Sequence, residues 1–131
     1  MDYEVFKRDL ESYKGLTREL NRLEEIRATY FYELEGVKGV SFDKVTGTYN
    51  EAEVEARKLE LIELINAKEA SIEYIQRRIV RIDRNISRLP AECQEICELN
   101  KKGWSFERIG RKIGYVKSGV QKLLKREVEK L

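Results

Sequence analysis

The feature that most constrains this chain is a run of aliphatic residues between positions 61 and 89, spaced alternately four and three apart. Its members are Leu61, Ile65, Lys68, Ile72, Ile75, Ile79, Ile82, Ile86 and Leu89. Apolar residues that repeat every three and a half positions form a seam along one side of an α-helix, and such a seam packs against another helix. The run therefore predicts a long helix that takes part in a coiled coil, with Lys68 as the polar member of its seam.

A second amphipathic pattern precedes this one. From Tyr3 to Leu34 the apolar residues again recur at steps of three and four, which predicts a helix of about 32 residues, roughly 50 Å long. Residues 36–50 contain three glycines and lose the pattern, so we expect a loop, and a poorly ordered crossover is favoured over a functional loop. Asn50 and Glu53 have capping-box spacing, so the second helix should begin there and pair with the first as an antiparallel hairpin.

Three apolar residues lie beside the seam rather than in it. Ile62, Leu64 and Val80 would widen the apolar stripe beyond what one partner helix covers. Because another protein surface would have to bury this stripe, we expect the hairpin, residues 1–89, to associate with copies of itself. A dimer is the expected homo-oligomer.

The only proline in the chain marks a change of organisation. Pro90 should end the second helix and begin the next, because it has no amide hydrogen to leave unsatisfied in a first turn. We therefore expect a second domain from 90 to 131. Cys93 and Cys97 fall four apart on one helical face, where they cannot readily close an unstrained disulfide, so reduced core thiols are expected.

Residues 105–131 have the spacing of a helix-turn-helix. Ser105 can cap a short helix, and Gly110 on its inner side would let another helix approach closely. Gly114 follows four residues later and can adopt the positive φ of a sharp turn, with the ring of Tyr115 placed beneath that turn. A second helix, from Lys117 to Lys130, should follow.

Val120 and Leu123 are expected to continue the buried face on that second helix. The fold class expected from the sequence is therefore all-α. It consists of a long antiparallel coiled-coil helical hairpin, residues 1–89, followed by a small three-helix helix-turn-helix domain, residues 90–131.

Charge is distributed unevenly along the chain. Residues 1–89 hold 16 Lys and Arg against 18 Asp and Glu, whereas from Leu99 onward the numbers are 10 and 3, a local net charge of +7. A polyanion, and specifically double-stranded DNA, is the expected partner. Trp104 is interpreted as a packing residue in preference to a base-stacking one.

The outer face of the second helix is expected to contact the DNA. Its residues are Lys117, Ser118, Gln121, Lys122, Lys125 and Arg126. The lysines and the arginine can neutralise phosphates, and Gln121 or Lys122 could reach base edges.

Enzymatic activity is the least supported class of function. The chain has no histidine, which excludes imidazole-based catalysis and imidazole zinc ligands, and two cysteines alone do not make a zinc site. We expect no cofactor and no metal. No apolar run approaches the roughly 20 residues that span a bilayer, and the first residues mix both charges, so a cytoplasmic protein without a membrane partner is expected.

The segment beginning Gly103-Trp104-Ser105-Phe106 and continuing to Leu131 resembles the helix-turn-helix of phage-encoded regulators of the ArpU and RinA type, which is similar to region four of bacterial sigma factors. The preceding hairpin with its glycine-containing loop also resembles small phage and prophage proteins of that group. The resemblance implies a recognition helix from Lys117, activation of late phage genes and contact with RNA polymerase. The chain departs from the pattern at Val116, where relatives usually have Ser or Thr, and at Gly119 within the recognition helix.

The leading hypothesis is therefore a phage or prophage transcriptional regulator that binds DNA and oligomerises through its coiled coil. A small terminase-like DNA-packaging subunit is the alternative, because such subunits also join a helix-turn-helix to helical oligomerisation segments. A regulator should form a small oligomer and a packaging subunit a ring. A third hypothesis, an interaction module that uses only the coiled coil, would leave the basic face without a role.

Overall fold

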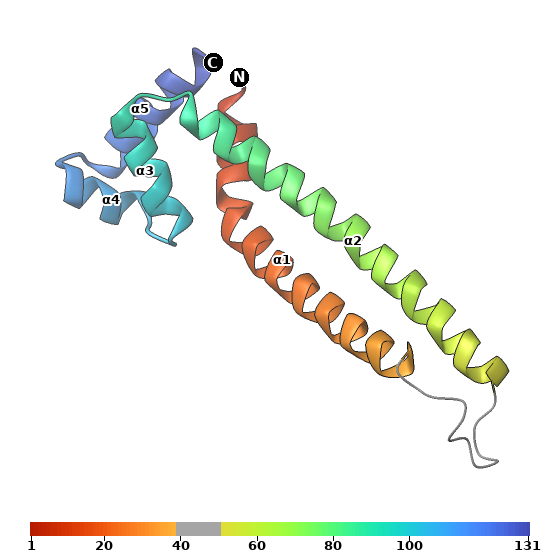
Figure 1. Ribbon diagram of the computed structural model, residues 1–131. Helices are drawn as coiled ribbons and strands as arrows, with labels where there is room; N and C mark the ends of the chain where they lie inside the picture. Colours follow the sequence, from red (N-terminus) through yellow and green to blue (C-terminus); the bar gives the residue numbers. More distant parts are fainter. Residues whose placement is uncertain (39–50) are drawn as a thin grey trace. The chain divides into compact units, whose positions relative to one another are not determined.

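The computed structural model describes residues 1–38 and 51–131, which form five helices and no strand (Figure 1). The helices are α1 (Tyr3–Lys38), α2 (Glu51–Ser87), α3 (Ala91–Lys101), α4 (Phe106–Ile113) and α5 (Lys117–Glu129). The predicted all-α class is confirmed. No helix in these two ranges combines the length and the apolar character that a membrane crossing needs.

α1 is longer than the apolar pattern predicts. It has 36 residues and continues through Gly36 to Lys38. Val37 supplies a reason, because it packs against a cluster of three buried residues, Leu34, Leu61 and Ile65. The expectation of a loop from residue 36 is thus wrong for its first three positions, and the rest of it, with the Asn50 cap, falls outside the described residues.

The described chain divides into two compact units. Unit 1 consists of residues 1–18 and 76–131, and unit 2 of residues 19–75. The boundary expected at Leu89 and Pro90 coincides with the end of a helix, since α2 ends at Ser87 and α3 begins at Ala91. The compact units nevertheless divide elsewhere, because both long helices contribute residues to each unit.

One hydrophobic core holds unit 1 together. α3, α4 and α5 contribute Ile96, Ile109 and Leu124, each 0% exposed. The same cluster contains buried residues from the first turns of α1 and the last turns of α2, namely Tyr3, Phe6, Leu10, Ile82 and Ile86. Full burial of an aliphatic or aromatic side chain contributes about 1.5–3 kcal/mol, so the long helices supply a large part of what stabilises the three short ones.

Unit 2 is held by contacts between α1 and α2. Leu61, 0% exposed, packs with Leu34 and Ile65, and Arg57 Nε donates a hydrogen bond to Glu33 Oε1 at 3.1 Å. Seam residues of the aliphatic run are buried there, as the spacing predicts. Ile62 lies beside the seam and is 40% exposed.

The ends of α3 follow from the residues that flank it. Pro90 precedes its first turn, and Gly103 follows its last turn with φ of 97°. Cys93 and Cys97 are free thiols, 1% and 0% exposed, so the expectation of reduced core cysteines is confirmed. Burial raises the pKa of Cys97 to about 12.

Candidate nucleic-acid interface

A glycine turn joins α4 to α5. Ser105 Oγ accepts a hydrogen bond from the amide of Arg108 at 3.2 Å, which satisfies one free amide in the first turn of α4. Gly114 has φ of 85°, and the amides of Gly114 and Tyr115 both donate to the carbonyl oxygen of Gly110 at 2.8 Å. The predicted cap and the predicted left-handed turn are confirmed.

Gly110 makes this turn sterically possible. A Cβ at this position would lie 2.3 Å from the carbonyl oxygen of Tyr115 and 3.3 Å from Val120 Cγ2. The first distance is far inside van der Waals contact. Because Gly110 has no side chain, the backbone of Tyr115 and the side chain of Val120 can both pack against it.

One detail of the predicted turn is wrong, and the predicted buried face of the second helix is correct only in part. The ring of Tyr115 is not buried beneath the turn: the residue is 41% exposed, and its Cδ1 lies 3.4 Å from the Cβ position of Gly119 on α5. Leu124, not Leu123, is fully buried, because the inner stripe of α5 follows steps of four from Val120. Leu123 lies at the edge of this stripe and packs against the core from there.

The six residues predicted to contact DNA all lie in α5, but they are not equally accessible. Exposed side chains belong to Lys117, Ser118, Lys122, Lys125 and Arg126. Gln121 is only partly exposed. Ser118, Lys122 and Lys125 are spaced four and three apart and so share one face of the helix.

Ion pairs divide the cations of α5 into two groups. In the second half of the helix, Lys125 Nζ lies 3.9 Å from Glu129, and Arg126 Nε lies 3.2 Å from Glu127. In the first half, neither Lys117 nor Lys122 has an acidic partner within 4.0 Å among the described residues. Uncompensated positive charge is therefore concentrated in the first half of α5.

The first turn of α5 also carries free amides. Val116 precedes the helix without a side-chain cap, and no acid occupies the first turn. The amides and the helix dipole there favour an anion. A phosphate near Lys117 would satisfy both the amides and the ammonium group.

Trp104 and Arg108 form a stacked pair that sequence reasoning missed. The guanidinium carbon of Arg108 lies 3.6 Å from the centroid of the Trp104 ring, and Lys112 Nζ lies 5.6 Å from it. Trp104 packs against the core of unit 1, which supports the packing interpretation. Trp104 precedes the N-cap residue Ser105 and so lies outside α4, and helical spacing therefore gave no signal for this contact.

Ion pairs with acids offset part of the local net charge of +7 from Leu99 onward. Of the ten Lys and Arg residues from 101 to 130, six lie within 4.0 Å of an acid. The other four are Lys102, Arg108, Lys117 and Lys122.

Comparison of this chain with protein-family models, curated proteins and solved structures finds no match. Its function is therefore inferred from the residues and geometry of the site itself.

Proposed function

We propose that this protein is a DNA-binding transcriptional regulator of a phage or prophage, in which α4 and α5 form a helix-turn-helix and α5 is the recognition helix. The observation that carries the proposal is the turn at Gly114, after which the first half of α5 presents Lys117, Ser118 and Lys122 as exposed side chains, and neither lysine has an acidic partner in the described part of the chain. A recognition helix contacts DNA mainly through its first half, where such charges are useful.

In this proposal the residues of α5 have different roles. Lys117 and the free amides of the first turn bind a phosphate, which positions the helix on the duplex. Ser118 and Lys122, exposed on one face, reach the base edges. Gln121 and the paired cations Lys125 and Arg126 contribute less than the sequence alone suggests.

The long helices are proposed to form a coiled-coil hairpin that brings two copies together. Exposed apolar side chains in unit 2 supply the surface for this, with Phe31 41%, Leu59 62% and Ile62 40% exposed. A dimer would present two α5 helices to two half-sites of an operator. Activation of late genes and contact with RNA polymerase are the roles that the resemblance to ArpU and RinA regulators implies.

The test is a salt titration of DNA affinity. Duplexes selected from a random pool are bound by the wild-type chain, by Lys117→Ala and by Lys122→Ala, with fluorescence anisotropy as the readout. Each variant should bind more weakly, and each lost phosphate contact should reduce the slope of log affinity against log salt by about 0.9. Arg22→Ala is the control, because Arg22 is exposed, lies in unit 2 and is paired with Glu19. Equal affinities for all four proteins would contradict the proposal.

The state of assembly separates a regulator from a packaging subunit. Light scattering at micromolar concentration should give the mass of a dimer or another small oligomer. A ring of many copies would favour the packaging subunit instead.

A further inference from the structure

A groove in unit 1 lies between α1 and the junction of α3 with α4. Its larger part is a pocket of about 400 Å³ lined by four cations, namely Lys14 and Arg18 from α1, Lys101 from the end of α3 and Lys102 from the turn that follows α3. Glu98 is the one acid in that lining. We call this pocket and the smaller one beside it the α1–α3 groove.

Lys14 is shared by the two parts of the groove. The smaller pocket, about 230 Å³, extends from Lys14 to Trp104 and Ser105 at the start of α4. Lys14 Nζ lies 3.2 Å from the Cβ position of Gly103, so a side chain at residue 103 would meet the ammonium group. Glu11 lines this smaller part and disfavours an anion there, which places the candidate anion site in the larger pocket.

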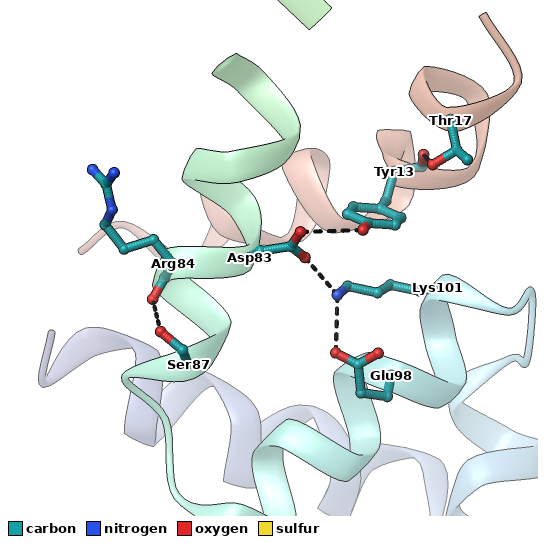
Figure 2. Close-up of polar contacts among 7 residues, drawn as sticks. All are labelled: Tyr13, Thr17, Asp83, Arg84, Ser87, Glu98 and Lys101. Carbon is teal, nitrogen blue, oxygen red and sulfur yellow. Dashed lines mark hydrogen bonds and ion pairs between the residues drawn. The ribbon is translucent and has the colours of Figure 1, made fainter. Parts of the chain in front are cut away.

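The charges in the larger pocket are only partly compensated. Lys101 Nζ lies 2.6 Å from Asp83 Oδ1 and 2.9 Å from Glu98 Oε1, and its side chain is 12% exposed (Figure 2). Lys101 thus engages both nearby acids. Within the described ranges, Lys14, Arg18 and Lys102 are exposed and have no acid within 4.0 Å.

Three like charges, two from α1 and one from the turn after α3, therefore border one hollow, and Glu98, the acid in its lining, is engaged by Lys101. Such an arrangement carries electrostatic repulsion that a bound anion would relieve. A phosphate group fits the chemistry, because it accepts several hydrogen bonds from ammonium and guanidinium donors at once.

We propose that the α1–α3 groove binds phosphate groups and that the backbone of DNA flanking the segment read by α5 supplies them. The assignment to DNA rests on the proposed function. α1 then has a role beyond oligomerisation, because its Lys14 and Arg18 extend the DNA contact of the three short helices.

Trp104 offers a readout close to the candidate anion site, because its pocket shares Lys14 with the larger pocket. It is the single tryptophan of the chain and lines the smaller pocket. Titration with inorganic tripolyphosphate should change the Trp104 fluorescence saturably in the wild type. The double variant Lys14→Ala/Lys102→Ala should bind at least about tenfold more weakly, since two charge-assisted contacts to the anion are lost. Circular dichroism should give similar melting curves for both proteins, because both side chains are exposed.

The control variant is Arg22→Ala/Lys58→Ala, which removes the same charge from unit 2, where the two side chains are paired with Glu19 and Glu55. Its tripolyphosphate response should equal that of the wild type. Lys117→Ala/Lys122→Ala is the α5 variant for the DNA measurements. A response in Lys14→Ala/Lys102→Ala equal to that of the wild type, or no saturable response in any protein, would overturn the phosphate site.

DNA binding then separates this proposal from the proposed function. On a long duplex, Lys14→Ala/Lys102→Ala should reduce the salt slope by about 2, and on a duplex only long enough for α5 it should change little. If only the α5 variant weakens binding to the long duplex, the groove assignment is wrong and the proposed function stands. If no duplex binds while tripolyphosphate does, the DNA assignment is wrong and the phosphate site stands.

Discussion

Lys101 Nζ lies 2.6 Å from Asp83 Oδ1, so an ion pair joins α3 to the last turns of α2 (Figure 2). The other oxygen of the same carboxylate accepts a hydrogen bond from the Tyr13 hydroxyl of α1 at 3.3 Å. Three helices thus meet at one side chain. The short helices of unit 1 depend on the two long ones for polar contacts as well as for core packing.

An isolated fragment of residues 90–131 should therefore not fold cooperatively. Without Tyr3, Phe6, Leu10 and the last turns of α2, several core positions of α3 and α5 would be exposed to water. Thermal unfolding followed by circular dichroism should show a broad, shallow change for the fragment and a sigmoidal transition for the full chain. A sharp transition of the fragment near the melting temperature of the full chain would refute this prediction.

Asp83→Ala should lower the free energy of unfolding by about 1–2 kcal/mol. The Lys101 side chain is only 12% exposed and would keep Glu98 as its one acidic partner. Glu19→Ala is the matched control, because it breaks a solvent-exposed pair with Arg22, whose side chains are 42% and 57% exposed, and it should change stability much less than Asp83→Ala does. Urea unfolding of both variants measures the difference, and equal losses would count against the prediction.

Two glycines in helices should respond to alanine in opposite directions. In Gly110→Ala the new Cβ would lie 2.3 Å from the carbonyl oxygen of Tyr115, so we expect a loss of about 2 kcal/mol or more. In Gly15→Ala the new Cβ would have no described heavy atom within 4 Å other than its own helix's neighbouring backbone, and the helix should gain about 0.5–1 kcal/mol. Chemical denaturation of both variants tests the pair. A stable Gly110→Ala protein would show that the turn at Gly114 can rearrange.

Tyr3→Phe should leave the stability unchanged or raise it by up to about 1 kcal/mol. The Tyr3 hydroxyl is buried and has no hydrogen-bond partner within the described structure. Its removal therefore breaks no hydrogen bond, and the folded chain no longer bears the cost of burying an unpaired hydroxyl. Burial also raises the pKa of this hydroxyl. Phe6→Ala is the contrast, because Phe6 is 2% exposed and should cost about 3–5 kcal/mol. A loss above 1 kcal/mol in Tyr3→Phe would reveal a partner for the hydroxyl.

The stability of unit 1 should fall in alkali partly through Cys97. Burial raises the pKa of this thiol from 9.0 to about 12 in the folded chain, so between these pH values the unfolded state loses its proton and the folded state keeps it. The contribution is fully present below pH 9 and is lost as the pH rises toward 12. Urea unfolding between pH 8 and pH 11 should show a steeper decline for the wild type than for Cys97→Ala. Parallel declines would contradict the assignment.

The local features of this chain could be predicted from its sequence because they depend on residues within one helical turn of each other. The aliphatic run predicted α2, Ser105 predicted the cap of α4, and Gly114 predicted the left-handed turn. Each is a rule about spacings of three or four positions, or about the φ that one residue type tolerates.

Local rules predicted the positions of the candidate site residues on their helix, but they did not predict the contacts of the side chains. The sequence places Lys117, Lys122, Lys125 and Arg126 on one helix. It does not show that Lys125 forms an ion pair with Glu129 and Arg126 with Glu127. The stacking of Arg108 on Trp104 depends on how the indole packs against the core.

By itself, the sequence determined the helical segments, the Ser105 cap of α4 and the sharp turn at Gly114, because backbone hydrogen bonds and helical periodicity act over a few residues. Only the tertiary structure decided that Tyr3 and Ile86 share a core with Leu124, that Asp83 joins three helices, and that Lys14 lies beside Lys102 in one groove. These relationships depend on which faces of distant helices meet, and burial of apolar surface selects that arrangement for the chain as a whole.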